Sequence, residues 1–379
     1  MIKRSFVLFF CVCFLVTVKG YAQNISPVVD ISIIHEAQKS ISRGIEYLRG
    51  TQQDDGSWDH YPAITALVIT AMLKSPGGIV QPGDPDVKKG LDFIIKHVKP
   101  DGGIYTDDPM RCYNTAISLL ALVEAHNTLY NDIISNAREY IIKLQADEQV
   151  GYSYEDSLYG GIGYGDDKRP DMSNLQTALE ALARTESYEK VSEADLKTRN
   201  GSEPLRGNRP YYEKAIVFLT RSQNLASTNP YSWASNDGGF IYYPGNSKAG
   251  GTRSYGSMTY AGLKSFIYAR VDKNDERVKA CYRWITDNYT VKENPGIGDN
   301  GLFYYYHTMS KALNVYGVDF IVTPDRQNHN WREDLMNQLM TIQKEDGSWI
   351  NDSARWWENN RDLVTAYTIL SLINAGWTE

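Results

Sequence analysis

Apolar residues recur at helical spacing along most of the chain, and the clearest examples lie near its two ends. Near the front, an amphipathic stretch precedes Gln-Asp-Asp-Gly-Ser-Trp at 53–58, and near the end a similar stretch precedes Gln-Lys-Glu-Asp-Gly-Ser-Trp at 343–349. A more apolar stretch follows each phrase and opens with Thr65 or Thr365. This pattern predicts a helix, a Gly-Ser-Trp turn and a second helix at both ends of the chain.

The same template fits the residues between the two ends. Six threonines open an apolar stretch and serve as register marks: Thr65, Thr115, Thr177, Thr259, Thr308 and Thr365. The six units are expected at about 36–75, 86–127, 133–185, 211–271, 276–317 and 331–375. Six helical hairpins form either an open solenoid or a closed ring. We expect the ring, as one all-α domain over residues 23–379, because the repeats tile nearly all of it and no strand pattern is evident.

Two segments depart from the repeat. Residues 186–210 are polar and are expected to project outside the ring. Residues 224–254 form the longest turn inside a unit and are rich in Tyr, Trp, Asn and Gly. Long aromatic loops on rigid scaffolds are common binding elements.

The N-terminus has the features of a secretory signal. Lys3 and Arg4 precede an apolar run over 6–18, and Gly20-Tyr21-Ala22 gives a small-residue cleavage site after Ala22. The run is shorter than the roughly 20 residues that a membrane-spanning helix needs. The protein is therefore expected to be secreted or periplasmic, with no stable membrane span after cleavage; an uncleaved anchor is the alternative.

Net charge and cysteine content give two further expectations, one about partners and one about disulfides. Cleavage would change the formal net charge from −7 to −10, which argues against nucleic acid as a partner. The remaining cysteines, Cys112 and Cys281, fall in units that face each other across a six-unit ring. We expect two small core residues there and no disulfide.

The hairpins joined by Gln-x-x-Asp-Gly-Ser-Trp turns resemble the repeats of squalene and terpene cyclases and of protein prenyltransferase beta subunits. The resemblance covers nearly the whole mature chain and implies an alpha/alpha toroid, with inner and outer rings of helices around a central cavity. It also implies a lipid-like or isoprenoid ligand.

The motifs that carry chemistry in those families are incomplete here. The cyclase acid motif corresponds to the segment 170–177, in which Asp171 matches, the proton-donor position is Ser173 and the third acid is Asn174. The prenyltransferase zinc site needs an acid two residues before its cysteine, and Cys112 is preceded there by Met110. We therefore expect no metal and no cofactor, and the resemblance leaves catalysis open.

The register also predicts which side chains face the cavity. Positions four before, one before and three after each threonine share one helix face. Because Ser173, at the cyclase acid position, lies four before Thr177, we expect this face to line the cavity. The predicted ligand-binding residues are Tyr61, Arg111, Asn114, Ser173, Gln176, Tyr255, Tyr304 and Arg361.

Three residues are candidates for acid–base chemistry: Asp171, Glu180 and His307. Each has a structural alternative. Asp171 suits a helix N-cap, Glu180 could pair with an arginine of a neighbouring unit, and His307 could be a buried core residue. An inward face with this much charge would be costly to bury dry and unpaired.

Three functions remain open. The first is binding of an amphiphilic or isoprenoid-type small molecule in the cavity. The second is cleavage of a glycan, which needs two carboxyl groups about 5–9.5 Å apart; the candidate acids are Asp107, Asp108, Asp166, Asp167, Asp171, Glu358 and Asp362. The third is a scaffold whose centre is filled by its own side chains. An apolar funnel reaching Ser173 would favour the first.

Overall fold

The computed structural model describes residues 24–107, 109–165, 169–189 and 209–378. The segment assigned to the signal, most of the predicted polar insertion, and the candidate acids Asp108, Asp166 and Asp167 lie outside these residues.

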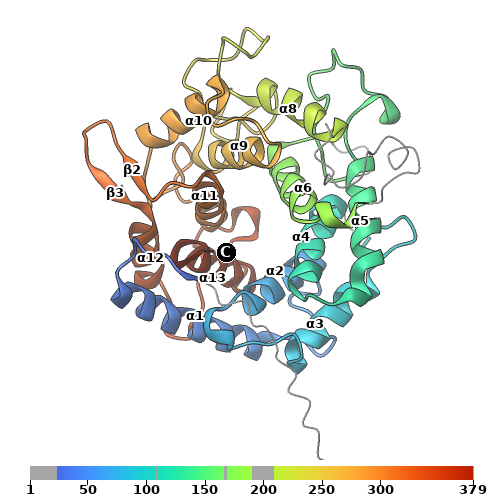
Figure 1. Ribbon diagram of the computed structural model, residues 1–379, viewed down its shortest axis with the longest axis vertical. Coiled ribbons are helices and arrows are strands. Elements are labelled where there is room, and N and C mark those ends of the chain that lie inside the picture. Colours follow the sequence, from blue (N-terminus) through green and yellow to red (C-terminus); the bar gives the residue numbers. More distant parts are fainter. Residues whose placement is uncertain (1–23, 108, 166–168, 190–208, 379) are drawn as a thin grey trace, which may run out of the picture.

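Two concentric rings of helices form the described part of the chain (Figure 1). The inner ring contains α2 (Pro62–Leu73), α4 (Arg111–Glu124), α6 (Met172–Arg184), α9 (Gly256–Tyr268), α11 (Leu302–Tyr316) and α13 (Arg361–Gly376). The outer ring contains α1 (Ile31–Thr51), α3 (Pro85–Lys96), α5 (Asn131–Lys143), α8 (Pro210–Ser222), α10 (Glu276–Asp287) and α12 (Trp331–Thr341). Each inner helix contacts the next, and α13 contacts α2, so the ring is closed. The predicted all-α toroid of six hairpins is confirmed.

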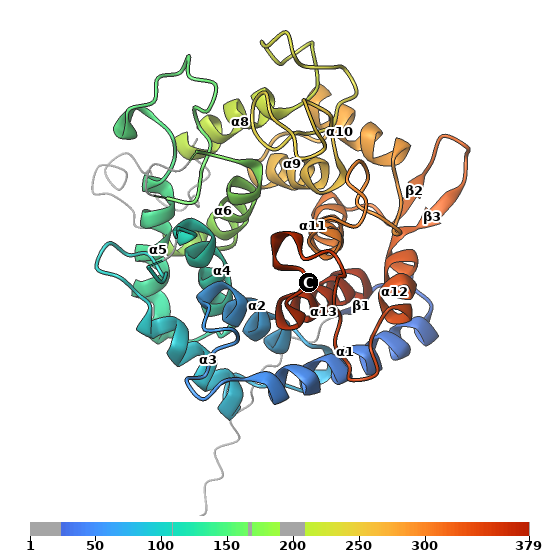
Figure 2. The same cartoon turned by 180° about the vertical axis from the view of Figure 1, so that it is seen from behind.

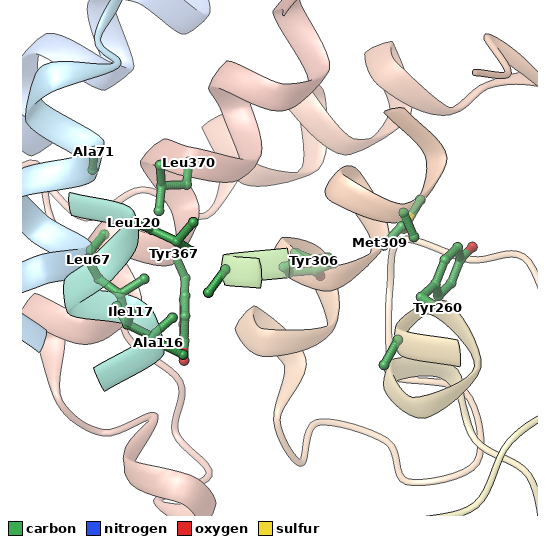
Figure 3. Packing of buried hydrophobic residues seen from close by; sticks show 14 of the residues in the cluster. Leu67, Ala71, Ala116, Ile117, Leu120, Tyr260, Tyr306, Met309, Tyr367 and Leu370 are labelled. Atoms are coloured by element: carbon green, nitrogen blue, oxygen red, sulfur yellow. The ribbon is translucent and has the colours of Figure 1, made fainter. Parts of the chain in front are cut away.

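The two rings differ in composition because they bury different amounts of surface. The outer helix α3 buries one face, with Val87, Leu91 and Ile94, and leaves its lysines in water. The inner helix α2 has almost no polar face and is buried nearly all round. Figure 3 shows part of the resulting core, including Leu67 of α2 and Ile117 of α4. Burying one such side chain contributes about 1.5–3 kcal/mol.

Four of the register threonines hold the turn that precedes their inner helix. Thr65 Oγ1 accepts a hydrogen bond of 3.0 Å from the Trp58 backbone N–H. The indole N–H of Trp58 donates to Leu48 O, 2.8 Å away, at the end of the outer helix. The equivalent bonds to threonine elsewhere are Ile104 N to Thr115, 3.0 Å, Phe240 N to Thr259, 3.1 Å, and Trp349 N to Thr365, 3.1 Å. One hydroxyl therefore joins the turn to the inner helix in four units.

The glutamine and glycine of the repeated phrase join the first and last units to the next outer helix. Gln52 Nε2 donates to Gly56 O within its own turn and to Asp86 O of α3, at 3.0 and 2.8 Å. Gly56 has a φ of +89°, and a Cβ there would lie 2.4 Å from Lys89 O of α3. Only glycine fits this position. Gln343 makes the equivalent bond to Ser40 O of α1 at 2.9 Å, which closes the ring between its last and first units.

Two small antiparallel pairings have no counterpart in the sequence pattern. β1 (Asn24–Ile25) pairs with β4 (Trp377–Thr378), and β2 (Phe320–Val322) pairs with β3 (Asn328–Asn330). Strands of two or three residues are too short to show an alternating pattern. The first pairing ties the two ends of the described chain together.

Two further expectations concern the cysteines and the membrane. Cys112 and Cys281 are buried and unpaired in the core, as predicted. Within the described ranges, no helix combines the length and apolar character needed to cross a bilayer.

Candidate functional site

A cavity of about 240 Å³ opens at the N-terminal end of the inner helices. All six inner helices contribute to its wall, together with the segments that precede them. Nine of its lining residues are aromatic and none carries a charge. They are Tyr61, Ala63, Ile64, Met110, Tyr113, Tyr164, Ser173, Tyr242, Tyr255, Ser257, Met258, Tyr304, Trp356, Trp357, Leu363 and Tyr367. The wall is therefore mostly apolar, and the polar groups of its side chains are hydroxyls and two indole N–H groups.

Four loops, and Asn114 of α4, cap the N-terminal ends of inner helices near the cavity. The first N–H groups of a helix have no partner within it, and in five units the following segment supplies one. The bonds are Ala63 N to Asn114 Oδ1 (3.0 Å), Cys112 N to Tyr164 O (2.9 Å), Met172 N to Tyr242 O (2.9 Å), Ser257 N to Asn294 Oδ1 (2.9 Å) and Tyr304 N to Glu358 Oε1 (2.7 Å). The loop before α13 reaches toward the centre of the ring (Figure 2).

Four of the predicted ligand-binding residues line the cavity: Tyr61, Ser173, Tyr255 and Tyr304. All four lie four residues before a register threonine, at or next to a helix N-terminus. Ser173 Oγ lies 3.3 Å from the Tyr304 hydroxyl, so these two side chains meet across the ring. An apolar space that reaches Ser173 is the arrangement expected for an isoprenoid-type ligand.

Two other predicted residues support the lining from behind. Gln176 Nε2 donates to the Tyr304 hydroxyl at 3.0 Å and to Thr177 Oγ1 at 2.7 Å. Asn114 uses its side-chain oxygen to cap α2. Both side chains are buried outside the lining, where they fix neighbouring helices.

The two predicted arginines do not line the cavity. Arg361 is exposed, and its Nη1 lies 2.7 Å from Asp346 Oδ2. The Arg111 guanidinium lies 4.9 Å from the centre of the Tyr105 ring. Both residues begin an inner helix, where a long side chain can turn back along the preceding turn. That route spares the cost of burying a charge in an apolar space.

Glu180 lies farther along the inner helices, in an ion-pair cluster. Its two carboxylate oxygens are each 2.6 Å from an ammonium nitrogen, those of Lys264 and Lys311. Burial alone would raise the pKa of Glu180, but the two lysines outweigh burial and lower it. Burial, opposed by Glu180, lowers the pKa of Lys264 to about 8. The expected partner was an arginine; the structure supplies two lysines.

His307 is buried beside this cluster. Its ring lies 5.0 Å from that of Tyr367, between centroids. Burial, and then the charge of Lys311, lower the pKa of His307 well below its usual value. The imidazole is therefore neutral and is placed as a core residue between the cavity and the ion pairs.

Asp171 acts as the N-cap of α6. Its Oδ1 accepts from Asn174 N at 2.9 Å and its Oδ2 from Asn174 Nδ2 at 3.0 Å. Burial raises the pKa of Asp171 to about 6, against the lowering effect of hydrogen bonds from Asn174 and Tyr242. The carboxyl group is fully buried, behind Tyr242 of the cavity wall.

Sequence reasoning missed much of the wall. Tyr164, Tyr242, Trp356 and Trp357 lie in loops, where helical register gives no orientation. The aromatic content of 224–254 was the one signal for Tyr242. The two tryptophans have φ of +56° and +65°, a strained region for residues with a Cβ. Trp357 packs edge-on against Tyr61, with ring centres 5.2 Å apart.

The described acids do not form a pair at the cavity. Asp107 is exposed, Glu358 is buried as the cap of α11, and Asp362 Oδ1 accepts from Thr51 at 2.8 Å. Burial raises the pKa of Glu358 to about 7. Over the described ranges, no three His, Cys, Asp or Glu side chains gather as a metal site would require.

Comparison with known proteins finds relatives by structure alone. No protein-family profile and no curated protein matches the sequence. Solved structures of the type II terpene cyclase MstE from Scytonema do match. One without ligand has a TM-score of 0.56 at 12% identity, covering 92% of this chain and 99% of that one. A complex with the substrate geranylgeranyl dihydroxybenzoate has a TM-score of 0.55 at 11% identity, covering 91% and 98%. The chain therefore has the alpha/alpha toroid fold of the terpene cyclases.

Proposed function

We propose that this protein binds an isoprenoid-type small molecule in the aromatic cavity at the N-terminal end of its inner helices. The observation that carries the proposal is the wall itself, with nine aromatic side chains, no charged group and an apolar route to Ser173. Small-molecule sites are typically concave and apolar, with a few polar groups that fix orientation.

The ionisation states keep this wall neutral. Burial raises the pKa of Tyr113 to about 12 and also raises the pKa values of Tyr255 and Tyr304. The phenols therefore stay protonated near neutral pH and offer apolar ring faces with hydroxyl donors. An engineered apolar cavity of about 150 Å³ holds benzene. A cavity of about 240 Å³ accepts a longer hydrocarbon group.

The structural relatives support the same ligand class. MstE structures contain geranylgeranyl dihydroxybenzoate as substrate or merosterolic acid A as product. From these structures we infer that the ligand of this protein contains an isoprenoid part, and we do not propose that this protein performs the same reaction. By the sequence resemblance, Ser173 corresponds to the proton-donor position, and Asp171 is engaged as a helix cap behind Tyr242. The geometry thus favours binding over proton transfer to an alkene.

The alternatives have less support. A glycan-cleaving enzyme needs two carboxyl groups at the substrate, and no described carboxylate belongs to the cavity wall. A scaffold with a filled centre would leave no cavity.

We also propose that the protein is exported with a signal cleaved after Ala22, on the basis of the sequence at 1–22.

A cavity-filling variant tests the proposal. Geraniol is titrated into the mature protein, and binding is followed by calorimetry and by quenching of tryptophan fluorescence, because Trp356 and Trp357 line the cavity. Ser173→Phe places a ring inside the cavity and should weaken binding by at least about tenfold, a change of about 1.4 kcal/mol. Ser187→Phe makes the same change on the surface, where Ser187 is exposed, and should leave binding unchanged. Equal binding by all three proteins would contradict the proposed site.

A further inference from the structure

Three positively charged side chains, each from a different segment, lie near the mouth of the cavity. Arg169 precedes α6, Lys248 lies in the long loop before α9, and Arg355 lies in the loop before α13. Arg355 belongs to the same short turn as Trp356 and Trp357 of the cavity wall. The cations are thus distant in sequence and brought together only by closure of the ring.

Each cation lies over an aromatic ring at or next to the mouth. The Arg169 guanidinium carbon lies 3.8 Å from the centre of the Tyr243 ring, and Lys248 Nζ lies 4.4 Å from that of Tyr242. The Arg355 guanidinium carbon lies 4.4 Å from the centre of the Trp356 ring. Tyr242 and Trp356 are cavity-lining residues, so the charges sit directly beside the apolar space. Cation–π contacts of this kind hold a charge in place without neutralising it.

The three charges are also close enough to act on one another. Burial, and then the charges of Arg169 and Arg355, lower the pKa of Lys248. In the described part of the chain, none of the three has a carboxylate oxygen within 4.0 Å, and Lys248 is unpaired although it is half-buried, unlike Lys264 and Lys311. The carboxyl group that acts on Arg169 and Lys248 is that of Asp171, whose pKa is about 6. Among the described residues, three positive charges at the mouth therefore face one carboxyl group, which leaves an excess of positive charge even when Asp171 is ionised.

The inner helices cannot use this charge, because their first N–H groups need hydrogen-bond acceptors, and guanidinium and ammonium groups carry only donors. Nor does packing require it, since Arg169 and Arg355 are exposed and Lys248 is half-buried. Like charges held together without counter-charges repel one another, and an added anion relieves that repulsion. Guanidinium and ammonium groups are the usual partners of phosphate and carboxylate oxygens.

We propose that Arg169, Lys248 and Arg355 form a subsite for the anionic end of the ligand, a phosphate or carboxylate whose attached hydrocarbon chain occupies the aromatic cavity. This inference rests on the proposed function and narrows it to anionic amphiphiles. The chain enters between Tyr242 and Trp356, and the head group stays at the mouth in contact with water. Neutral terpenes of the same length bind the cavity alone.

Three ligands of equal chain length test the subsite: geraniol, geranic acid and geranyl phosphate. At about 20 mM salt, the protein should bind geranyl phosphate at least about tenfold more tightly than geraniol, with geranic acid between them, because hydrogen bonds to charged groups are the strong ones. Raising the salt to about 500 mM should reduce this preference, since exposed charges are screened. Geranic acid bound as tightly as geranyl phosphate would identify a carboxylate as the matching head group.

Variants separate this inference from the proposed function. Lys248→Met combined with Arg355→Met keeps the apolar stems against Tyr242 and Trp356 and should abolish the preference for geranyl phosphate, with geraniol binding as in the wild type. Lys273→Met is the matched control, because Lys273 also lies over a tyrosine ring, 5.3 Å from the centre of Tyr316, at the opposite end of α11. It should keep the full preference.

The outcomes are distinct. Geraniol and geranyl phosphate binding equally to the wild type would overturn the subsite and leave the cavity proposal standing. A preference that survives in the double variant would also overturn it. Binding of none of the three ligands would overturn both proposals.

Discussion

Two regions of the inner ring differ in how their inward side chains are used: the aromatic cavity at the N-terminal ends of the helices, and the ion-pair cluster farther along them. At the N-terminal end, buried hydroxyl groups and capping loops surround an open aromatic cavity that contains no charged side chain. Farther along the inner helices α6, α9 and α11, Glu180, Lys264 and Lys311 meet in buried ion pairs. Both sets of side chains come from the inner helices or the loops before them; Glu180 and Lys311 lie three residues after a register threonine, and Lys264 lies five after one. What differs is whether their side chains bond to one another or leave room for a ligand.

The contrast extends to two carboxyl groups on the same helix. Glu180 and Asp171 both belong to α6 or its cap, and both are buried. Two lysines lower the pKa of Glu180, whereas burial raises the pKa of Asp171 to about 6. Burial therefore does not by itself indicate the charge of a carboxyl group; the partners within hydrogen-bond reach decide it.

Removing the anion of the ion-pair cluster should have the largest effect. Glu180→Ala leaves two lysines buried beside each other without a counter-charge, and should lower the free energy of unfolding by about 3–5 kcal/mol. Denaturant unfolding at pH 7 measures this loss. Glu213→Ala, an exposed acid of α8, is the control and should change stability by under about 0.5 kcal/mol. A loss below about 1 kcal/mol for Glu180→Ala would mean that the cluster is not closed in solution.

The carboxyl group of Asp171, which caps α6, should make the protein less stable as the pH rises. Because the pKa of Asp171 is raised from 3.8 to about 6, its contribution to stability is complete below pH 3.8 and is lost as the pH rises through 6. Asp171→Asn removes this loss, which amounts to about 3 kcal/mol at pH 8.

Unfolding of wild type and Asp171→Asn at pH 4.5 and pH 8 provides the measurement. From pH 4.5 to pH 8, the free energy of unfolding of the wild type should fall relative to that of the variant. The pKa of Glu358 is also raised, but its effect on stability is the same in both proteins and drops out of the difference. A parallel fall in both proteins would show that Asp171 is already ionised in the folded state.

Replacing the whole ion-pair cluster should cost much less than removing one member. The combination Glu180→Gln, Lys264→Met and Lys311→Met leaves no buried charge at this site, and buried ion pairs can be exchanged for well-packed neutral side chains at little cost. We expect a stability change within about 2 kcal/mol and unchanged geraniol binding. Weaker geraniol binding in this variant would show that the ion-pair cluster and the cavity are coupled.

The smallest effect is expected at Arg361. Its partner is Asp346 in an exposed ion pair, and such pairs contribute about 0–1 kcal/mol. Arg361→Met should therefore leave both stability and geranyl phosphate binding nearly unchanged in denaturation and titration experiments. A large loss of binding would place Arg361 at the ligand after all and would shift the anionic subsite away from Lys248 and Arg355.

The helical register identified part of the cavity wall and failed for the rest for a definable reason. Tyr61, Ser173, Tyr255 and Tyr304 were found because a short or flat side chain at a helix start points where its Cβ directs it. Arg111 and Arg361 occupy equivalent positions, but their long side chains turn back to partners in the preceding turns. A periodic pattern gives the direction of the Cβ atom and does not give the position of a charge several bonds away.

The sequence by itself determined the closed ring. Thr65 and Thr365, and the Gln, Gly and Trp of each repeated turn, form bonds within their own unit or to the adjacent helix, so a repeat in sequence becomes a repeat in space. Only the tertiary structure decided the site. Tyr242, Trp356 and the cations Lys248 and Arg355 come from irregular loops, and their meeting at one mouth depends on ring closure and on loops that cap neighbouring helices. Such contacts between distant segments leave no periodic signal in the chain.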